Sequence, residues 1–280
     1  MENETINIGG ANNGGNNGGN NNLPPNMGFP MDDEFKTPTE EVALPSKGAF
    51  YPGQKSTVKV KYLTAEEDNI LFSPELIKNG KVLDVLLESA VLDKDLRPDD
   101  MVSGDRNYLL IEIRKTGFGN EYKPGEIMCP ECGQFDRPVV NLDLLKPRLL
   151  EQMPNEKGEY ELELPVTKMI IKFRLLRGSD EKRLSKTIES GNKKGNVRVS
   201  KLVTERYLLQ IMEVNGNRDK TYISRFISAM PTKDSLFFRE YNRQIEPGID
   251  LNYTFECPHC GNFHEQDVPI NSRLFYPETK

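Results

Sequence analysis

The sequence contains no tryptophan, only two histidines and only four cysteines in 280 residues. It has no run of eighteen apolar residues, which excludes a membrane-spanning helix. It also has no short apolar segment behind basic residues at the N-terminus, which argues against a secretory signal. We therefore expect a soluble protein without a membrane span that folds in a cytosol. Because a cytosol keeps thiols reduced, the cysteines are not expected to form disulfides.

An excess of basic residues is also missing. Residues 1–46 hold seven acidic residues and one base, Lys36, and the rest of the chain is balanced at 36 bases and 36 acids. Proteins that bind nucleic acids usually carry a basic excess, because Lys and Arg release counterions from the phosphates. The acidic N-terminal region and the neutral remainder therefore disfavour nucleic acid as a partner.

The scarcity of histidine limits the catalytic chemistry. Both histidines, His259 and His264, lie beside the last two cysteines, so no histidine remains elsewhere to act as the base of a nucleophilic triad. The sequence shows no carboxylate pair in a recognisable catalytic motif and no glycine-rich phosphate-binding loop. We expect no enzymatic activity and no small-molecule substrate.

Composition divides the chain into four regions. Residues 1–43 form an Asn/Gly-rich acidic tail, which we predict to be disordered because it buries too little apolar surface to offset its backbone entropy. Residues 44–145 hold a helical region and the first cysteine pair. Residues 146–246 form an inserted subdomain with a β-hairpin and helices. Residues 247–280 hold the second cysteine pair.

Capping signals predict helices in the region before the first cysteine pair. Thr64, followed by acidic residues, predicts one helix start. Ser73 and Pro74 predict a second helix, which runs on toward Val91. Pro98 predicts a further start, and the apolar run over residues 108–114 favours a buried helix.

The inserted region combines two periodicities. Residues 160–164 and 169–175 alternate polar and apolar side chains and predict a β-hairpin. Between residues 180 and 244, apolar side chains recur at three- and four-residue steps and predict helices, with Ile211 and Met212 in the first of them. The predicted fold class is therefore α+β, with a mostly helical body.

The four cysteines fall in two copies of one motif, Cys129-Pro130-Glu131-Cys132-Gly133 and Cys257-Pro258-His259-Cys260-Gly261. A two-residue spacing lets both thiolates of a pair bind one ion, and the glycine can adopt a positive φ. The flanking residues predict that each motif is the turn of a hairpin. We therefore predict that Cys129, Cys132, Cys257 and Cys260 bind one zinc ion in a zinc ribbon that is split by 124 residues.

Structural zinc is favoured over three alternatives. Closing a loop of this length costs about 5 kcal/mol, whereas a structural zinc site contributes about 10 to 16 kcal/mol. A thioredoxin-type redox pair needs a single motif at a helix start, and disulfides do not suit a cytosol. Iron or an iron–sulfur cluster is a less favoured metal that four thiolates also suit. His264 is an alternative ligand.

Several stretches outside the cysteine motifs carry a family resemblance. They are Leu44-Pro45-Ser46-Lys47-Gly48 with Tyr51-Pro52, Leu63 to Asp68, Gly104-Asp105-Arg106 with Tyr108-Leu109-Leu110, Gly119 to Tyr122, and Phe173 to Leu176 with Ser179-Asp180-Glu181. Together with the two cysteine motifs, their order resembles the baseplate protein family of T-even-type contractile-tailed bacteriophages. The likeness covers about residues 44 to 270.

The resemblance implies a structural component of a phage tail baseplate, associated with the central hub or its assembly and made in the cytoplasm of the infected bacterium. It implies other baseplate and hub proteins as partners and no enzymatic activity. In this setting we expect Gly104-Asp105-Arg106 to form a turn and helix cap whose Arg106 pairs with a carboxylate in the core. The alternative function is a zinc-ribbon module that binds nucleic acid or takes part in transcription.

Overall fold

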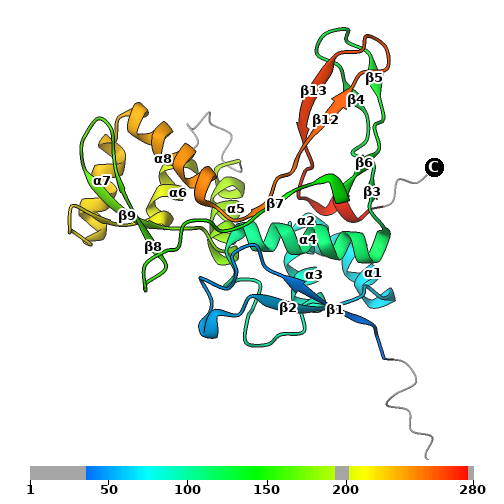
Figure 1. Cartoon of the computed structure of the whole chain (residues 1–280), viewed down its shortest axis with the longest axis horizontal. Coiled ribbons are helices and arrows are strands. Elements are labelled where there is room, and N and C mark those ends of the chain that lie inside the picture. Colours follow the sequence, from blue (N-terminus) through cyan, green and yellow to red (C-terminus); the bar gives the residue numbers. More distant parts are fainter. Residues whose placement is uncertain (1–35, 193–201, 277–280) are drawn as a thin grey trace, which may run out of the picture. The chain divides into compact units, whose positions relative to one another are not determined.

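The computed structural model describes residues 36–192 and 202–276 of the chain. The described residues from Thr37 onward belong to one compact unit (Figure 1). The division into the three predicted regions after the tail stays a prediction. Most of the predicted tail, residues 1–35, lies outside the described residues.

Helices and strands alternate irregularly, as expected for the α+β class. The helices are α1 (Ala65–Leu71), α2 (Pro74–Lys78), α3 (Val82–Ala90), α4 (Ser103–Phe118), α5 (Gly178–Asn192), α6 (Leu202–Gln210), α7 (Lys220–Ala229) and α8 (Thr232–Ile245), with 3-10 turns η1 (Pro52–Gln54), η2 (Leu142–Leu144) and η3 (Ser272–Phe275). The strands are β1 (Thr39–Ala43), β2 (Thr57–Lys61), β3 (Glu121–Tyr122), β4 (Ile127–Met128), β5 (Phe135–Asp136), β6 (Val140–Asn141), β7 (Pro147–Arg148), β8 (Glu159–Glu163), β9 (Ile170–Arg174), β10 (Ile211–Val214), β11 (Gly248–Ile249), β12 (Asn252–Glu256) and β13 (Phe263–Asp267).

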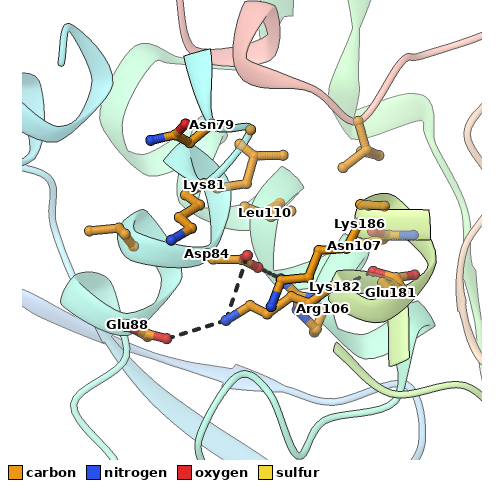
Figure 2. Close-up of a pocket in the computed structure, with 15 residues that line it drawn as sticks. Asn79, Lys81, Asp84, Glu88, Arg106, Asn107, Leu110, Glu181, Lys182 and Lys186 are labelled. Carbon is orange, nitrogen blue, oxygen red and sulfur yellow. Dashed lines mark hydrogen bonds and ion pairs between the residues drawn. The ribbon is translucent and has the colours of Figure 1, made fainter. Parts of the chain in front are cut away.

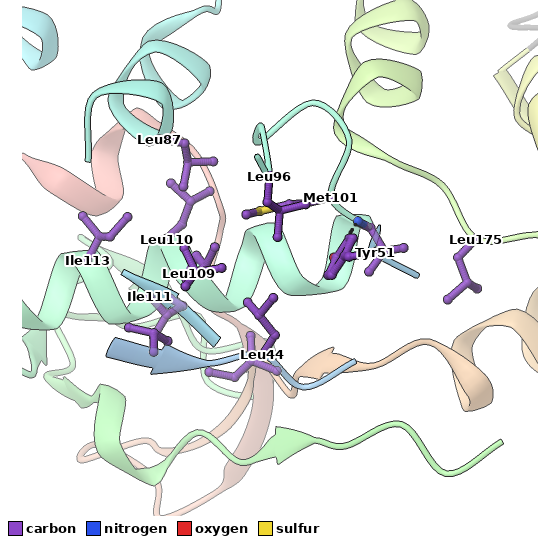
Figure 3. Close-up of a cluster of buried hydrophobic side chains, with 14 of the residues drawn as sticks. Leu44, Tyr51, Leu87, Leu96, Met101, Leu109, Leu110, Ile111, Ile113 and Leu175 are labelled. Carbon is purple, nitrogen blue, oxygen red and sulfur yellow. Dashed lines mark hydrogen bonds between the residues drawn. The ribbon is translucent and has the colours of Figure 1, made fainter. Parts of the chain in front are cut away.

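Helix α4 lies at the centre of the main hydrophobic core. The predicted buried helix over residues 108–114 is confirmed as part of α4, whose Leu109, Leu110, Ile111 and Ile113 side chains are buried. Figure 3 shows them packed against Leu44, Leu87 and Met101 from the surrounding segments. Three consecutive buried apolar residues, Leu109 to Ile111, point in different directions around a helix, so α4 must be covered on more than one side.

Two of the stretches that carry the family resemblance meet at the start of α4. The buried carboxylate of Asp105 accepts hydrogen bonds from the Tyr51 hydroxyl at 2.6 Å and from the Ser46 backbone N–H at 3.0 Å. The Tyr51 oxygen in turn accepts from the backbone N–H of Val102 at 3.1 Å. Burial raises the pKa of Asp105, and the Ser46 and Tyr51 hydrogen bonds partly offset that rise. This network fixes the loop before β2 onto α4.

A short antiparallel pair closes the base of the inserted region. β7 and β11 pair at Pro147↔Ile249 and Arg148↔Gly248, so the two ends of the insertion run side by side. This neck lies against the first turn of α4, where a Cβ added to Gly104 would lie 1.7 Å from the Pro247 carbonyl oxygen. Only a glycine lets the two backbones approach this closely.

The last residues of the predicted tail differ from the prediction. Residues 39–43, the end of the predicted disordered tail, form β1, which pairs antiparallel with all five residues of β2. The register places Val42 opposite Val58, and both are buried. Val42 is the one buried residue of β1, and the two acids before it, Glu40 and Glu41, are exposed, so the strand had no clear alternation in the sequence.

The capping signals are confirmed at Thr64 and Ser73, which cap α1 and α2. The helix predicted from Ser73 toward Val91 is wrong, because it breaks at Gly80, whose φ is 64°, and resumes as α3. The start predicted at Pro98 is also wrong. Residues 98–100 form a turn, and the helix begins at Ser103 after the extended Val102.

The inserted region holds a three-stranded sheet. The predicted hairpin is confirmed as β8 and β9, and β10 adds a third strand beside β9. The helix predicted through Ile211 and Met212 is therefore wrong at its end, because α6 stops at Gln210. Ile211 pairs with Phe173 of β9, and Met212 lies at a register shift within β10. Helices α7 and α8 form as predicted, and the buried Phe238 of α8 packs edge-to-face on Phe173 of β9.

Substituting Gly104→Ala should destabilise the protein by about 3 kcal/mol or more, because the new methyl group collides with the backbone of the neck. Gly117→Ala is the matched control in the same helix, since its methyl group meets only the flexible side chain of Leu63. Chemical denaturation measures both. Equal stability of the two variants would show that the close approach of α4 to the neck does not contribute.

The carboxylate of Glu67 should make the stability pH-dependent. Desolvation alone would raise its pKa, but Lys61, Ser89 and Thr64 outweigh this and lower the pKa of Glu67 from 4.5 to about 2. A depressed pKa stabilises the fold above the unfolded value, and the contribution is lost as pH falls from 4.5 toward 2.

Glu67→Gln should therefore lower the free energy of unfolding by about 1 to 3 kcal/mol at pH 7. Its stability should converge on that of the unsubstituted protein near pH 2. The exposed Glu66→Gln in the same helical turn is the control. A difference between Glu67→Gln and the unsubstituted protein that is constant with pH would contradict this assignment.

Candidate metal centre

The first cysteine motif lies at the tip of a two-part hairpin. β3 pairs with β6 at the base of this hairpin, and β4 pairs with β5 nearer the tip. The base is fixed to α4 by the buried Arg114, which donates hydrogen bonds to the carbonyl oxygens of Gly119, Glu121 and Leu274 at 2.7 to 2.8 Å. Three carbonyls from two segments of the chain thus converge on one guanidinium. Burial lowers the pKa of Arg114.

The second cysteine motif is the turn between β12 and β13. The two strands pair along five residues, from Asn252↔Asp267 to Glu256↔Phe263. Their side chains alternate between two faces, as the strand period requires. Phe255 on one face is buried with Cys129 and Cys257 in a small apolar cluster of its own. This contact joins the second hairpin to the first.

The four cysteine sulfurs come together as predicted. They all lie within 4.8 Å of one another, with 3.7 Å between Cys129 and Cys260 and 3.7 Å between Cys132 and Cys257. Four sulfurs arranged tetrahedrally around an ion at a bond length of about 2.3 Å are separated by about 3.8 Å. The spacing fits a tetrahedral metal site. Figure 1 shows the two hairpins that carry it, β4 with β5 and β12 with β13, side by side.

The backbone of the two motifs is the same. In each, the first cysteine donates its N–H to the residue two after the second cysteine, Gln134 or Asn262, at 2.8 and 2.9 Å. The glycine N–H returns a bond to the first cysteine's carbonyl oxygen. Gly133 and Gly261 both have a φ of 71°, and a Cβ there would meet nothing within 4 Å. Both positions therefore need glycine for its backbone conformation and not for lack of space.

The two sulfurs of each motif differ in exposure. Cys129 and Cys257 are buried, whereas Cys132 and Cys260 are exposed. The Nε2 atom of His264 lies 3.1 Å from the Cys129 sulfur, and the four-residue group that can hold a metal does not include this histidine. His264 is therefore placed beside the cluster as a hydrogen-bonding neighbour of one sulfur.

The pKa values of the Cys129 and Cys260 thiols are shifted in opposite directions. The backbone N–H of Cys132 is the main cause that lowers the pKa of Cys129 to about 6. The N–H of Asn262 lowers the pKa of Cys260, but desolvation and the three neighbouring sulfurs outweigh it and raise the value to about 12. Four thiols at this spacing cannot all ionise unless a cation compensates their charge. The electrostatics thus favour a bound cation.

A second candidate site is the pocket between α3, α4 and α5 (Figure 2). Arg106 in its wall forms ion pairs with Asp84 at 2.6 Å and Glu181 at 3.3 Å. Lys182 pairs with Asp99 at 2.6 Å and lies 3.6 Å from Asp84. The charges at its centre are thus matched with one another, and they tie three helices together.

The predicted pairing of Arg106 with a carboxylate is confirmed by this pocket. The predicted turn and cap at Gly104-Asp105-Arg106 is wrong, because all three residues lie inside the first turn of α4 and the residue before that helix makes no side-chain cap. Their packing roles explain the discrepancy: the glycine touches the neck and the aspartate holds Tyr51.

Comparison with models of known protein families shows which family this chain belongs to. A family model described as "T4 bacteriophage base plate protein" matches residues 37–275, which span the core, the insertion and both cysteine hairpins. The chain belongs to this family. The resemblance noted in the sequence is thereby confirmed, and with it a structural role in a phage baseplate that involves binding other phage proteins. Searches against curated proteins and solved structures gave no match.

No helix among the residues that the structure describes is long and apolar enough to cross a membrane. Membership of a baseplate family favours a protein without catalytic activity. It also implies a location in the tail baseplate of the virion.

The cysteine ligand set was recognisable because it repeats, but its surroundings were not. The contact of His264 with the Cys129 sulfur and the anchoring of the hairpin by Arg114 depend on residues far apart in the chain. The alternation of side chains along a strand was the one sequence signal that could show which residues near the cysteines face outward. It identifies Phe135 and Phe263 only once the strand register is known.

Proposed function

We propose that this protein is a structural component of the central hub region of a phage tail baseplate, or of its assembly, and that it acts by binding neighbouring proteins rather than by turning over a substrate. The observation that carries the proposal is the family match over residues 37–275. Assembly takes place in the cytoplasm of the infected bacterium, and other baseplate and hub proteins are the partners.

The proposal includes one structural zinc ion held by Cys129, Cys132, Cys257 and Cys260. Support comes from sulfur spacings of 3.7 Å, which fit tetrahedral zinc. Four sulfur ligands leave no position for a catalytic water, so zinc here would supply structure and not chemistry. His264, at 3.1 Å from the Cys129 sulfur, would donate an N–H to that thiolate.

The zinc would turn two chain-distant hairpins into one rigid ribbon. The hairpins carry motifs separated by 124 residues, and each is a short two-stranded sheet. Isolated two-stranded hairpins are marginally stable in water. A shared metal ion therefore gives the ribbon a fixed shape with which a neighbouring protein can be recognised.

Protein purified under reducing conditions should contain about one equivalent of zinc per chain. Cys132→Ser should drop the zinc content to below about half an equivalent and lower the melting temperature, because a three-sulfur site binds the ion more weakly. Glu131→Gln, which changes an exposed neighbour in the same turn, is the control and should keep its metal.

Elemental analysis by mass spectrometry measures the metal content and separates zinc from iron. Less than about half an equivalent of either metal in the unsubstituted protein would contradict the site.

Disrupting the gene in an infecting phage should leave tails without complete baseplates, while heads still fill with DNA. Electron micrographs of the lysate show both structures directly. Supplying the unsubstituted gene on a plasmid is the control and should restore baseplates. Normal baseplates in the disrupted phage would contradict the proposed function and favour a zinc-ribbon protein that binds nucleic acid.

A further inference from the structure

The two cysteine hairpins expose large apolar side chains at equivalent positions. Phe135 and Phe263 each lie three residues after the second cysteine of their motif and are 59% and 66% exposed. Among the residues that the structure describes, Phe72 is the only other phenylalanine that is more than half exposed, at 58%. The Phe72 ring packs against the ring of Tyr276 at a centroid distance of 5.6 Å, so it already has an intramolecular contact.

The strand registers show that these rings belong to outward faces. In the second hairpin, Phe263 is directly opposite Glu256, and Glu265 and Asp267 follow on the same face. The opposite face carries Phe255, which is buried at the metal centre. In the first hairpin, Phe135 is directly opposite Met128, which is 55% exposed. The second hairpin therefore buries Phe255 beside the cysteines and presents Phe263 on its other face, and the first hairpin presents Phe135 beside Met128.

The charge around these rings is predominantly negative. Residues 126–137 and 252–267 contain six carboxylates, no lysine and one arginine, Arg137, which pairs with Glu126 at 2.9 Å. The carboxylates are Glu126, Glu131, Asp136, Glu256, Glu265 and Asp267. An aromatic anchor inside a charged rim is the usual anatomy of a protein-binding surface.

We infer that the outward faces of the two hairpins dock onto a basic surface of another phage tail protein, with Phe135 and Phe263 inserted as apolar anchors. This rests on the proposed function for the class of partner. The sign of the charge selects the occupant, because an acidic face attracts a basic one and repels acidic ones. A second copy of this chain would bring the same acidic faces together.

Two further occupants are disfavoured by the same argument. Residues 1–46 of this chain hold seven acids and one base, so they would be repelled from the hairpins. Nucleic acid would be repelled as well, since it carries a negative charge at every phosphate. The zinc ribbons that bind nucleic acid need a basic surface, and these hairpins do not supply one.

The test places a photo-crosslinking phenylalanine analogue at position 263 of the full chain, supplied in infected cells to a phage whose own gene is disrupted. The control carries the analogue at position 72. We expect a crosslink at position 263 to a basic segment of an identified tail protein, and none to that protein from position 72. A crosslink only to a second copy of the chain, to its own N-terminal region or to nucleic acid would overturn the inference, as would no crosslink at all.

Binding to the identified protein is then measured with purified variants. Phe135→Ser combined with Phe263→Ser should weaken binding at least about tenfold, whereas Phe72→Ser should leave it unchanged. Replacing Glu256, Glu265 and Asp267 by their amides should slow association and flatten its dependence on salt. Melting temperature and metal content, measured on each variant, ensure that a loss of binding does not reflect a loss of folding.

Complementation separates this inference from the proposed function. If disruption of the gene blocks baseplates and the double phenylalanine variant restores them fully, the docking surface is wrong and the baseplate role stands. If disruption leaves baseplates normal, the baseplate role itself fails. The inference holds when the double variant stays folded with its metal, fails to restore baseplates, and Phe72→Ser restores them.

Discussion

The close approach of α4 to the neck of the insertion is the constraint on which the rest of the structure depends. Where Gly104 meets Pro247 and Gly248, no side chain separates the two backbones. Gly248 begins β11, which pairs with β7, so the chain that leaves the first hairpin at the neck returns beside itself before it enters the second. The fold therefore brings the two cysteine hairpins close together without a bound metal.

This constraint lowers the entropy cost of the proposed metal site. A loop of 124 residues between the cysteine pairs is closed at its neck, which leaves only residues 133–146 and 250–256 to be restrained by the ion. Because the closure cost grows with the logarithm of loop length, the shorter path saves about 1.5 kcal/mol. Arg114 adds to this by fixing the base of the first hairpin to α4 and to the segment of Leu274.

Local signals in the sequence were enough for much of the fold. The caps at Thr64 and Ser73, the hairpin of β8 and β9, and the convergence of four cysteines all rest on short-range patterns, and the structure contains each of them. Prediction failed where a distant contact overrides a local preference. Ile211 continued a helical pattern but pairs with β9.

The candidate metal site was also only partly predictable from the sequence. The ligands could be named from their repeated spacing, because two cysteines two residues apart already face one ion. The histidine beside the Cys129 sulfur and the outward rings of Phe135 and Phe263 depend on strand register, which the sequence alone did not fix. The role of Gly104 also lay beyond prediction, since its partner is more than one hundred residues away.

The central claim is that four cysteine sulfurs hold one structural metal ion that joins the two hairpins. X-ray absorption at the metal edge of the purified protein tests it most directly. The account predicts a zinc edge with four sulfur neighbours at about 2.3 Å. A shell that contains nitrogen or oxygen ligands at about 2.0 Å would contradict it, because it would place His264 or water on the metal in place of a cysteine.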